Sequence, residues 1–284
     1  MTKLIALIDG SLYSHSVCDH AAWVAGRTGA AVEILHVIGR RETGSPPADL
    51  SGSLKLGART ALLEELATLD EQRGKLAQKR GRAILEDAKA KIAAAGVTEV
   101  TTRLRIGDLV EAVAECEAEA DLVVIGKRGE AADFARLHLG SNLERVARSS
   151  RRPLLVAARA FKPIERFLIA YDGGTSSMKA VDTVARSRLF SGLRCSLVTV
   201  GPDSENTRKR LGNAQALLEA GGYAVEGMVI DGDPETVIAE TVEKQAIDLL
   251  VMGAYGHSRI RSLIIGSTTA EMLRSCKIPV MLFR

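Results

Sequence analysis

The chain has 284 residues, which is enough for two compact domains of ordinary size. Hydrophobic residues make up 46% of it, charged residues 26% and aromatic residues 4%, and the formal net charge is +3. This composition excludes collagenous and disordered proteins, and no apolar run approaches the ~20 residues that cross a bilayer. A balanced charge with few aromatic residues also argues against nucleic acid. We therefore expect a globular protein that engages neither membrane nor nucleic acid.

The cysteines and histidines do not group into a metal or redox site. The four cysteines lie far apart and form no C-x-x-C pair, which fits a reducing compartment. No two of the five histidines have the i, i+4 spacing of a helical metal site. The apolar run at the N-terminus ends after five residues at Asp9, too short for a signal peptide. These features predict a cytoplasmic location and no metal site.

In chain order, both halves alternate short apolar runs with longer helical patterns, which predicts parallel strands joined by crossover helices. Strands are expected near Leu4 and at 32–38, 99–104, 122–125, 154–157, 167–171, 195–200, 224–230, 249–252 and 280–283. Helices of the second half are expected at 177–190, 205–220, 234–245 and 267–276. Pro279 lies before the last run and suits the entry to an edge strand.

The two halves repeat each other. Residues 121–129 align with residues 248–256 at an offset of 127, and Gly140-Ser141 aligns with Gly266-Ser267 at an offset of 126. Upstream, residues 4–10 align with residues 167–173 at an offset of 163. The repeat predicts a first domain at 1–160 and a second at 161–284, with roughly 36 additional residues in the first.

The additional residues form an insertion at about 40–75, which begins as a loop rich in turn formers. Residues 56–95 then predict one long helix or two, because Gly74 and Gly81 weaken the middle. Its apolar stripe includes Leu62, Leu63, Leu66 and Leu69. A stripe of this kind needs a partner. The other half of the chain, a second subunit and the chain's own sheet all remain open as that partner.

Glycine motifs follow the fourth expected strand of each half. In the second half, Gly253-x2-Gly256-x9-Gly266-Ser267 joins a strand end to a helix start. In an open parallel sheet, ligands bind beyond the carboxyl ends of the strands, where the strand order reverses. Glycines allow close approach of a phosphate, and the N–H groups of a helix start attract anions. A triphosphate fits this pattern; the alternative is that the glycines and the serine are only strand ends and helix caps.

This spacing resembles the ATP-binding pattern of the universal stress protein family. Asp172, the Gly-Asp-Pro segment at 232–234 and Pro279 are similar to further landmarks of that family. The resemblance covers nearly the whole chain as two tandem domains, except the insertion. It implies an α/β fold with two doubly wound domains, each with a five-stranded parallel sheet in the order 3-2-1-4-5, like that of the adenine nucleotide alpha hydrolases.

The resemblance also implies ATP, with or without magnesium, as the ligand. The implied contacts in the second domain are Asp172, Gly173, Val229, Ile230, Gly253, Gly256, His257, Arg259, Gly266, Ser267 and Thr268. Asp172 would face the adenine and ribose, the backbone around Val229 and Ile230 would lie near the base, and the helix start at Gly266 would hold phosphate oxygens. Asp172 alternatively caps the first helix of its domain.

The first half departs from the family spacing. Ten residues instead of nine separate Gly129 from Gly140, and this loop holds Glu130 and Asp133. Because carboxylates repel phosphates, we expect a degenerate nucleotide motif here and ATP binding mainly in the second domain. A second candidate site in the first domain comprises Asp9, Gly126, Gly129, Gly140 and Ser141.

These features favour a cytoplasmic stress-response protein that binds ATP and acts as a nucleotide-responsive regulatory or interaction module. The alternatives are a non-nucleotide scaffold whose surface serves dimerisation, and a slow ATPase. No catalytic residues are assigned, since neither a G-x-S-x-G elbow nor a Walker lysine motif occurs. We expect the two domains to pair within the chain and the chain to form a homodimer.

Overall fold

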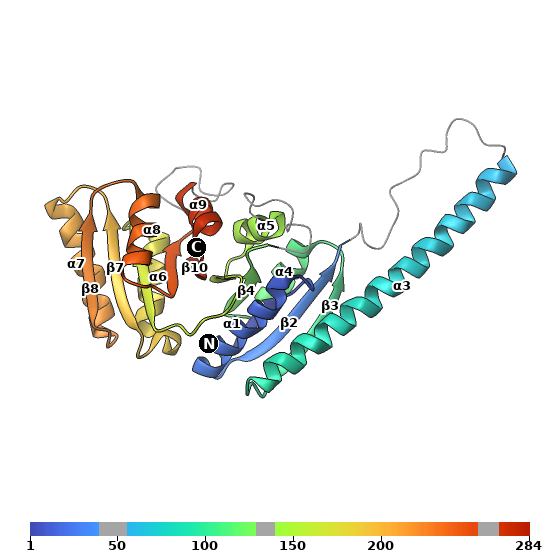
Figure 1. Cartoon of the computed structure of the whole chain (residues 1–284), viewed down its shortest axis with the longest axis horizontal. Coiled ribbons are helices and arrows are strands. Elements are labelled where there is room, and N and C mark those ends of the chain that lie inside the picture. Colours follow the sequence, from blue (N-terminus) through green and yellow to red (C-terminus); the bar gives the residue numbers. More distant parts are fainter. Residues whose placement is uncertain (40–55, 129–139, 255–266) are drawn as a thin grey trace.

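The computed structural model describes residues 1–39, 56–128, 140–254 and 267–284. Across these residues, ten strands form one sheet in the order β3-β2-β1-β4-β5-β10-β9-β6-β7-β8 (Figure 1). Each half has the predicted order 3-2-1-4-5. Neighbouring strands are parallel within each half, and β5 and β10 join the halves by antiparallel pairing. The predicted α/β fold with tandem doubly wound domains is therefore confirmed.

The elements follow the repeat. The first half contains β1 (Lys3–Leu7), α1 (Leu12–Thr28), β2 (Ala31–Ile38), α3 (Leu56–Ala94), β3 (Val100–Ile106), α4 (Leu109–Glu117), β4 (Leu122–Gly126), α5 (Ser141–Ser149) and β5 (Leu154–Ala157). The second half contains β6 (Arg166–Ala170), α6 (Thr175–Arg186), the 3-10 turn η2 (Arg188–Phe190), β7 (Arg194–Val200), α7 (Glu205–Ala220), β8 (Val225–Ile230), α8 (Pro234–Lys244), β9 (Leu249–Gly253), α9 (Ser267–Ser275) and β10 (Val280–Phe283). No described helix is long and apolar enough to cross a membrane.

The core lies on both faces of the sheet, because strand side chains alternate between the faces. Leu4 and Ala6 of β1 pack with α1 and α3, whereas Ile5 and Leu7 pack with α4 and α5. In the second half, α6 and α7 cover the first face and α8 and α9 cover the other. This burial on two sides explains why the strands read as continuous apolar runs.

Two sequence predictions for the second half are wrong in detail. The helix expected at 177–190 ends at Arg186, because Ser187 is extended and its hydroxyl accepts a hydrogen bond (3.2 Å) from the N–H of Leu189, which starts the 3-10 turn. The strand after Pro279 is not an edge strand, since β10 lies between β9 and β5. Pro279 precedes the strand and contributes its carbonyl, which accepts from the N–H of Leu250 at 3.1 Å. Its missing N–H therefore removes no bond from the sheet.

The insertion helix α3 is one continuous helix of 39 residues. Its C-terminal part packs on the chain's own sheet, where Leu85, Ala88 and Ile92 are buried. At Gly81, a β-carbon would lie only 2.8 Å from a methyl group of Leu104 on β3, so glycine permits the close approach. The N-terminal part extends away from the sheet (Figure 1). Residues 40–55, the start of the predicted insertion, lie outside the described residues.

Polar contacts reinforce the junction of the halves beside the β5–β10 pair. The guanidinium group of Arg27 on α1 donates to the carbonyls of Leu189 and Ser191. The ammonium group of Lys127, directly after β4, donates to the carbonyl of Cys276 at the end of α9. These contacts tie side chains of the first half to backbone carbonyls of the second.

Candidate functional site

A cavity of about 1010 Å³ lies at the carboxyl ends of the strands in the first domain. Its walls include Asp9 after β1, Val37 on β2, Gly126 at the end of β4 and Ser141 at the start of α5. Strands β1 and β4 are neighbours in the sheet, although the chain leaves them in opposite directions toward β2 and β5. The cavity therefore occupies the place where ligands bind in doubly wound sheets.

The structure brings together most of the first-domain candidate residues. Asp9, Gly126, Gly140 and Ser141 all line the cavity. Gly129 lies outside the described residues. Sequence reasoning missed other lining residues, among them Tyr13, Asp108 and Arg145.

An aspartate organises the strand-to-helix turn in both domains. Oδ1 of Asp9 accepts hydrogen bonds from the N–H two residues later (3.0 Å) and from the hydroxyl of Ser14 (3.3 Å). Oδ1 of Asp172 accepts from the N–H two residues later (2.8 Å) and from the hydroxyl of Ser177 (2.5 Å). Both carboxylates thus organise the turn before the first helix of their domain, although Asp172 is not itself the N-cap of α6, a position that Gly174 occupies. This role is compatible with ligand contact, because a carboxylate offers about four acceptor positions.

The glycine that ends the fourth strand of each domain has a packing reason of its own. A β-carbon at Gly126 would lie 2.7 Å from that of Tyr13, at the start of α1. A β-carbon at Gly253 would lie 3.0 Å from that of Ser176, at the start of α6. These glycines let the first helix of each domain lie against the strand end. Their presence alone is therefore not a sign of a ligand.

The start of α5 provides the groups that attract an anion. Gly140 is the N-cap of this helix and has no side chain to accept hydrogen bonds from the first N–H groups. Gly140, Ser141 and Asn142 all line the cavity. Unpaired N–H groups and the positive end of the helix dipole favour a phosphate or carboxylate at such a position.

The charged side chains of the cavity are mixed. Oδ1 of Asp108 caps α4, accepting from the N–H of Val110 at 2.8 Å, and its Oδ2 pairs with the guanidinium of Arg145. The Arg145 hydrogen bond holds the pKa of Asp108 below its ordinary value. Arg128 is the other cation that lines the described part of the cavity, and Glu111 adds a carboxylate. A polyphosphate here would rely on backbone N–H groups more than on excess positive charge.

The second domain repeats the strand-end geometry with a different cation. The guanidinium of Arg210 on α7 donates to the carbonyl of Asp172 at 3.2 Å and lies against Gly173. Gly173 has a φ of +70°, so a side chain there would be strained and would also collide with Arg210. In the first domain, the corresponding glycine faces the apolar side chain of Ile84. Among the described residues, the glycine after the first strand therefore meets a positive charge in the second domain and an apolar side chain in the first.

Only part of the second-domain motif can be placed. Gly253 ends β9, and the hydroxyl of the buried Thr269, in the first turn of α9, donates to its carbonyl at 3.3 Å. Thr268 is half-buried beside it. Ser267 begins α9, but its side chain lies outside the described residues. The remaining predicted contacts, Gly256, His257, Arg259 and Gly266, lie outside them as well.

Val229 and Ile230 lie on β8, the edge strand, two strands away from β6. In the first domain, the cavity is lined by Val37 on β2 and by Gly107 after β3, and its described lining includes no residue of β3 itself. The offset of 163 that aligns the first strands pairs Val37 with Val200 at the end of β7. In the sequence, the strand order and this offset together are the signal that points to Val200 on β7 instead of to β8.

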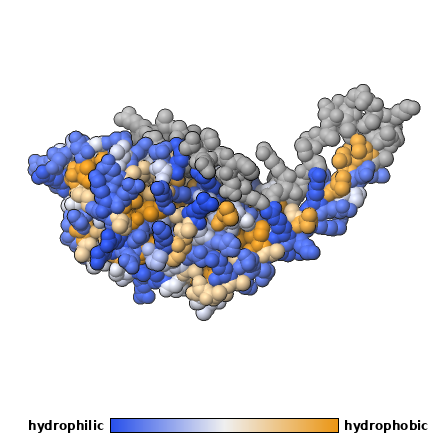
Figure 2. All heavy atoms as spheres, in the orientation of Figure 1, coloured by the Kyte–Doolittle hydropathy of each residue, from blue (hydrophilic) through white to orange (hydrophobic). Residues whose placement is uncertain are grey.

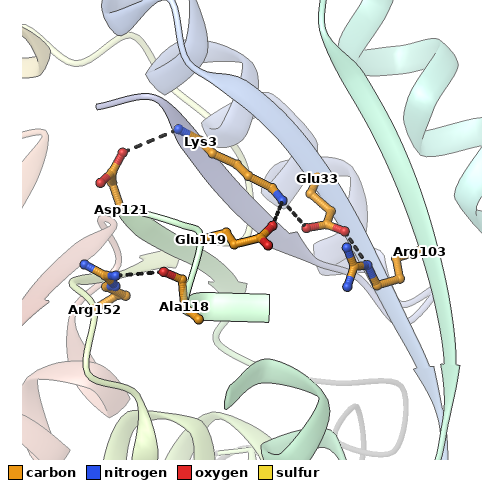
Figure 3. Close-up of polar contacts among 7 residues, drawn as sticks. All are labelled: Lys3, Glu33, Arg103, Ala118, Glu119, Asp121 and Arg152. Carbon is orange, nitrogen blue, oxygen red and sulfur yellow. Dashed lines mark hydrogen bonds and ion pairs between the residues drawn. The ribbon is translucent and has the colours of Figure 1, made fainter. Parts of the chain in front are cut away.

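A second polar cluster lies toward the amino ends of the strands (Figure 3). Glu33 on β2 is 3% exposed, and its carboxylate pairs with Lys3 Nζ at 2.9 Å and with Arg103 Nε. The hydrogen bond that Lys3 donates to Glu33 contributes most to the raised pKa of Lys3. Oδ2 of Asp121 accepts from the backbone N–H of Thr2 at 2.6 Å. We assign this cluster to stability, since each buried charge is matched and no cavity adjoins it among the described pockets.

Comparisons with known proteins agree with this architecture. Residues 1–158 and 202–284 match the Universal stress protein family. Universal stress protein Slr1230 of Synechocystis sp. is 38% identical over 287 aligned positions, which cover 100% of both chains. A crystal structure of a universal stress protein from Archaeoglobus fulgidus DSM 4304 superposes with a TM-score of 0.75 at 20% identity, covering 99% of this chain and 98% of that one. A structure from Pseudomonas aeruginosa UCBPP-PA14 superposes with a TM-score of 0.62 at 17% identity, covering 100% and 93%.

Proposed function

Because the chain belongs to the universal stress protein family, we propose that it binds ATP at the carboxyl ends of its parallel strands and acts as a nucleotide-responsive regulatory or interaction module. The observation that carries this proposal is the first-domain cavity of about 1010 Å³ at the strand-order reversal, beside the start of α5, because the second domain repeats the strand-end turn that borders this cavity. It combines a space large enough for a nucleotide with N–H groups suited to phosphate.

The second domain is the main ATP site in this proposal. Its strand-end turn repeats that of the first domain, and it alone has the family spacing G-x2-G-x9-G-S. Arg210 adds a cation at the end of β6, where the first domain presents Ile84. Asp172 and Gly253 would border the nucleoside, and the start of α9 with Ser267 and Thr268 would hold phosphate oxygens. A cytoplasmic location and a homodimer belong to the same proposal.

Magnesium is compatible with this site. Mg²⁺ is commonly held by substrate phosphates, waters and only one or two carboxylates. The described residues contain no group of three or more metal-binding side chains, but an ion of this kind does not require one. Asp172 is the carboxylate that the resemblance places beside the ligand.

Calorimetric titration with ATP and with adenosine tests phosphate recognition in the second domain. We expect ATP to bind more tightly than adenosine in the wild-type protein. The double variant Ser258→Glu with Ile260→Asp places two carboxylates in the loop before Gly266, as in the first domain. It should weaken ATP far more than adenosine, because only ATP carries the phosphates. An equal loss for both ligands, or no ATP binding by the wild type, would overturn the proposal and favour the scaffold function.

A further inference from the structure

The N-terminal part of α3 projects from the molecule as a straight arm (Figure 1). We use the name α3 arm for residues 62–80. The helix continues without a break into the part that packs on β2 and β3, where Leu85 and Ile92 are buried. The arm is therefore held at a fixed direction by the rest of its own helix.

The α3 arm exposes an apolar stripe to solvent. The exposed fractions are 48% for Leu63, 44% for Leu69 and 68% for Leu76. Figure 2 shows apolar side chains gathered along the projecting helix. Leu62, Leu66, Leu69 and Leu76 follow one another at spacings of four, three and seven residues. This is the heptad spacing of a seam that packs against another helix.

Charges along the arm are divided into two blocks. Residues 64–71 contain four acidic residues and no basic one, whereas residues 73–82 contain five basic residues and no acidic one. Gln72 separates the blocks. A second copy of the arm in antiparallel orientation places each acidic block against a basic block. Two parallel copies would place like charges together, and a peptide of one charge would match only one block.

We propose that the α3 arm pairs with the α3 arm of a second chain as an antiparallel two-helix interface centred near Gln72. Around this centre, Leu69 of one chain lies beside Leu76 of the other, and Glu64 lies opposite Arg80. The interface is isologous, because the same residues are used by both chains, and such an interface closes at a dimer. Arg73 occupies the seam position between Leu69 and Leu76, and a polar seam residue restricts the register. This inference is independent of nucleotide binding.

Sedimentation of the full chain tests the association. We expect the wild type to be a dimer at micromolar concentration and Leu69→Glu to raise the dissociation constant at least ten-fold, with an unchanged circular dichroism spectrum. The matched control is Met178→Glu on α6, since Met178 is similarly exposed at 37% and lies on another element. It should associate as the wild type does. A monomeric wild type at 100 µM, or equal effects of the two substitutions, would overturn the proposal.

Cysteine cross-linking tests the orientation. Antiparallel arms centred near Gln72 bring the two copies of this residue together, so Gln72→Cys should form a disulfide-linked dimer under mild oxidation. The two copies of residue 78 would be separated by 12 residues, or roughly 18 Å along the helix at ~1.5 Å per residue. Gln78→Cys should therefore give no linked dimer. Efficient cross-linking at both positions would indicate parallel arms, and cross-linking at neither would exclude pairing of the arms.

Discussion

Lys127 places an ammonium group in a buried position at the junction of the two halves. It donates a hydrogen bond to the carbonyl of Cys276, and only 9% of the residue is exposed. Burial is the main reason that its pKa falls from 10.5 to about 8, and the charge of Arg128 acts in the same direction. Lys127→Met keeps a long side chain but removes the titrating group. The substitution should therefore change how the stability of the protein depends on pH.

The direction of this effect follows from proton binding. Below pH 8, Lys127 is protonated in the folded and the unfolded states, and its contribution does not change with pH. Between about pH 8 and 10.5, the folded state loses the proton while the unfolded state keeps it. The unfolded state then binds more protons, so the free energy of unfolding rises with pH. At about 1.36 kcal/mol per pKa unit, the full gain is about 3 kcal/mol, most of it reached by pH 10.

Urea unfolding at pH 7, 8, 9 and 10 measures this gain. Lys127→Met is compared with its parent in a Cys276→Ala background, because the Cys276 thiol interacts with Lys127 while the hydrogen bond uses the backbone carbonyl. Burial raises the pKa of the Cys18 and Cys195 thiols to about 12, and their effect above pH 9 is common to both proteins. We expect the parent to gain about 2–3 kcal/mol relative to the methionine variant by pH 10. A difference that stays constant from pH 7 to 10 would refute the reasoning.

Three further predictions concern packing, charge and ligand contacts. Glu33→Ala leaves two partly buried cations without their shared carboxylate and should lower the free energy of unfolding by about 1–3 kcal/mol in urea; an unchanged midpoint would show that the cluster contributes nothing. Gly81→Val should destabilise the protein by about 1–3 kcal/mol because its β-carbon meets Leu104, whereas Gly74→Ala, with open space around it, should stabilise by up to about 1 kcal/mol. In calorimetry, Ser267→Ala should weaken ATP binding by about 1–3 kcal/mol. If this loss is smaller than that from Arg259→Ala, the charge of the loop before Gly266 contributes more to phosphate binding than the start of α9 does.

The two tandem α/β domains were predictable because the chain contains the same pattern twice, whereas the strand order 3-2-1-4-5 was implied by the resemblance to the universal stress protein family. Buried parallel strands give continuous apolar runs, and an internal repeat fixes which runs correspond. The antiparallel pairing of β5 with β10, which joins the two halves into one sheet, was not predictable in the same way. The runs at 154–157 and 280–283 are short, apolar and free of charge, and that pattern fits a strand paired on one side or on both. Pro279 favoured an edge, yet its position before the strand leaves the sheet bonds of β10 intact.

The candidate site was predictable where a residue repeats between the domains. Asp9 and Asp172 follow the first strand at equivalent positions, and both organise the following turn. Residues that reach the site only from a distant helix of the folded chain are not marked by the repeat. Arg145 enters the cavity by pairing with Asp108 from another helix, and Arg210 reaches the end of β6 from α7. Contacts between distant elements depend on packing and do not follow from local sequence patterns.

Native mass spectrometry of the purified protein, before and after addition of ATP, tests the central claim most directly. We expect one ATP or AMP mass per chain in the wild type. Gly266→Val should remove it by blocking the backbone approach at the start of α9, and Gly140→Val in the first domain should leave it in place. Two nucleotides per chain, with equal loss from the two substitutions, would contradict the assignment of the main site to the second domain. The absence of any bound nucleotide at saturating ATP would contradict nucleotide binding itself.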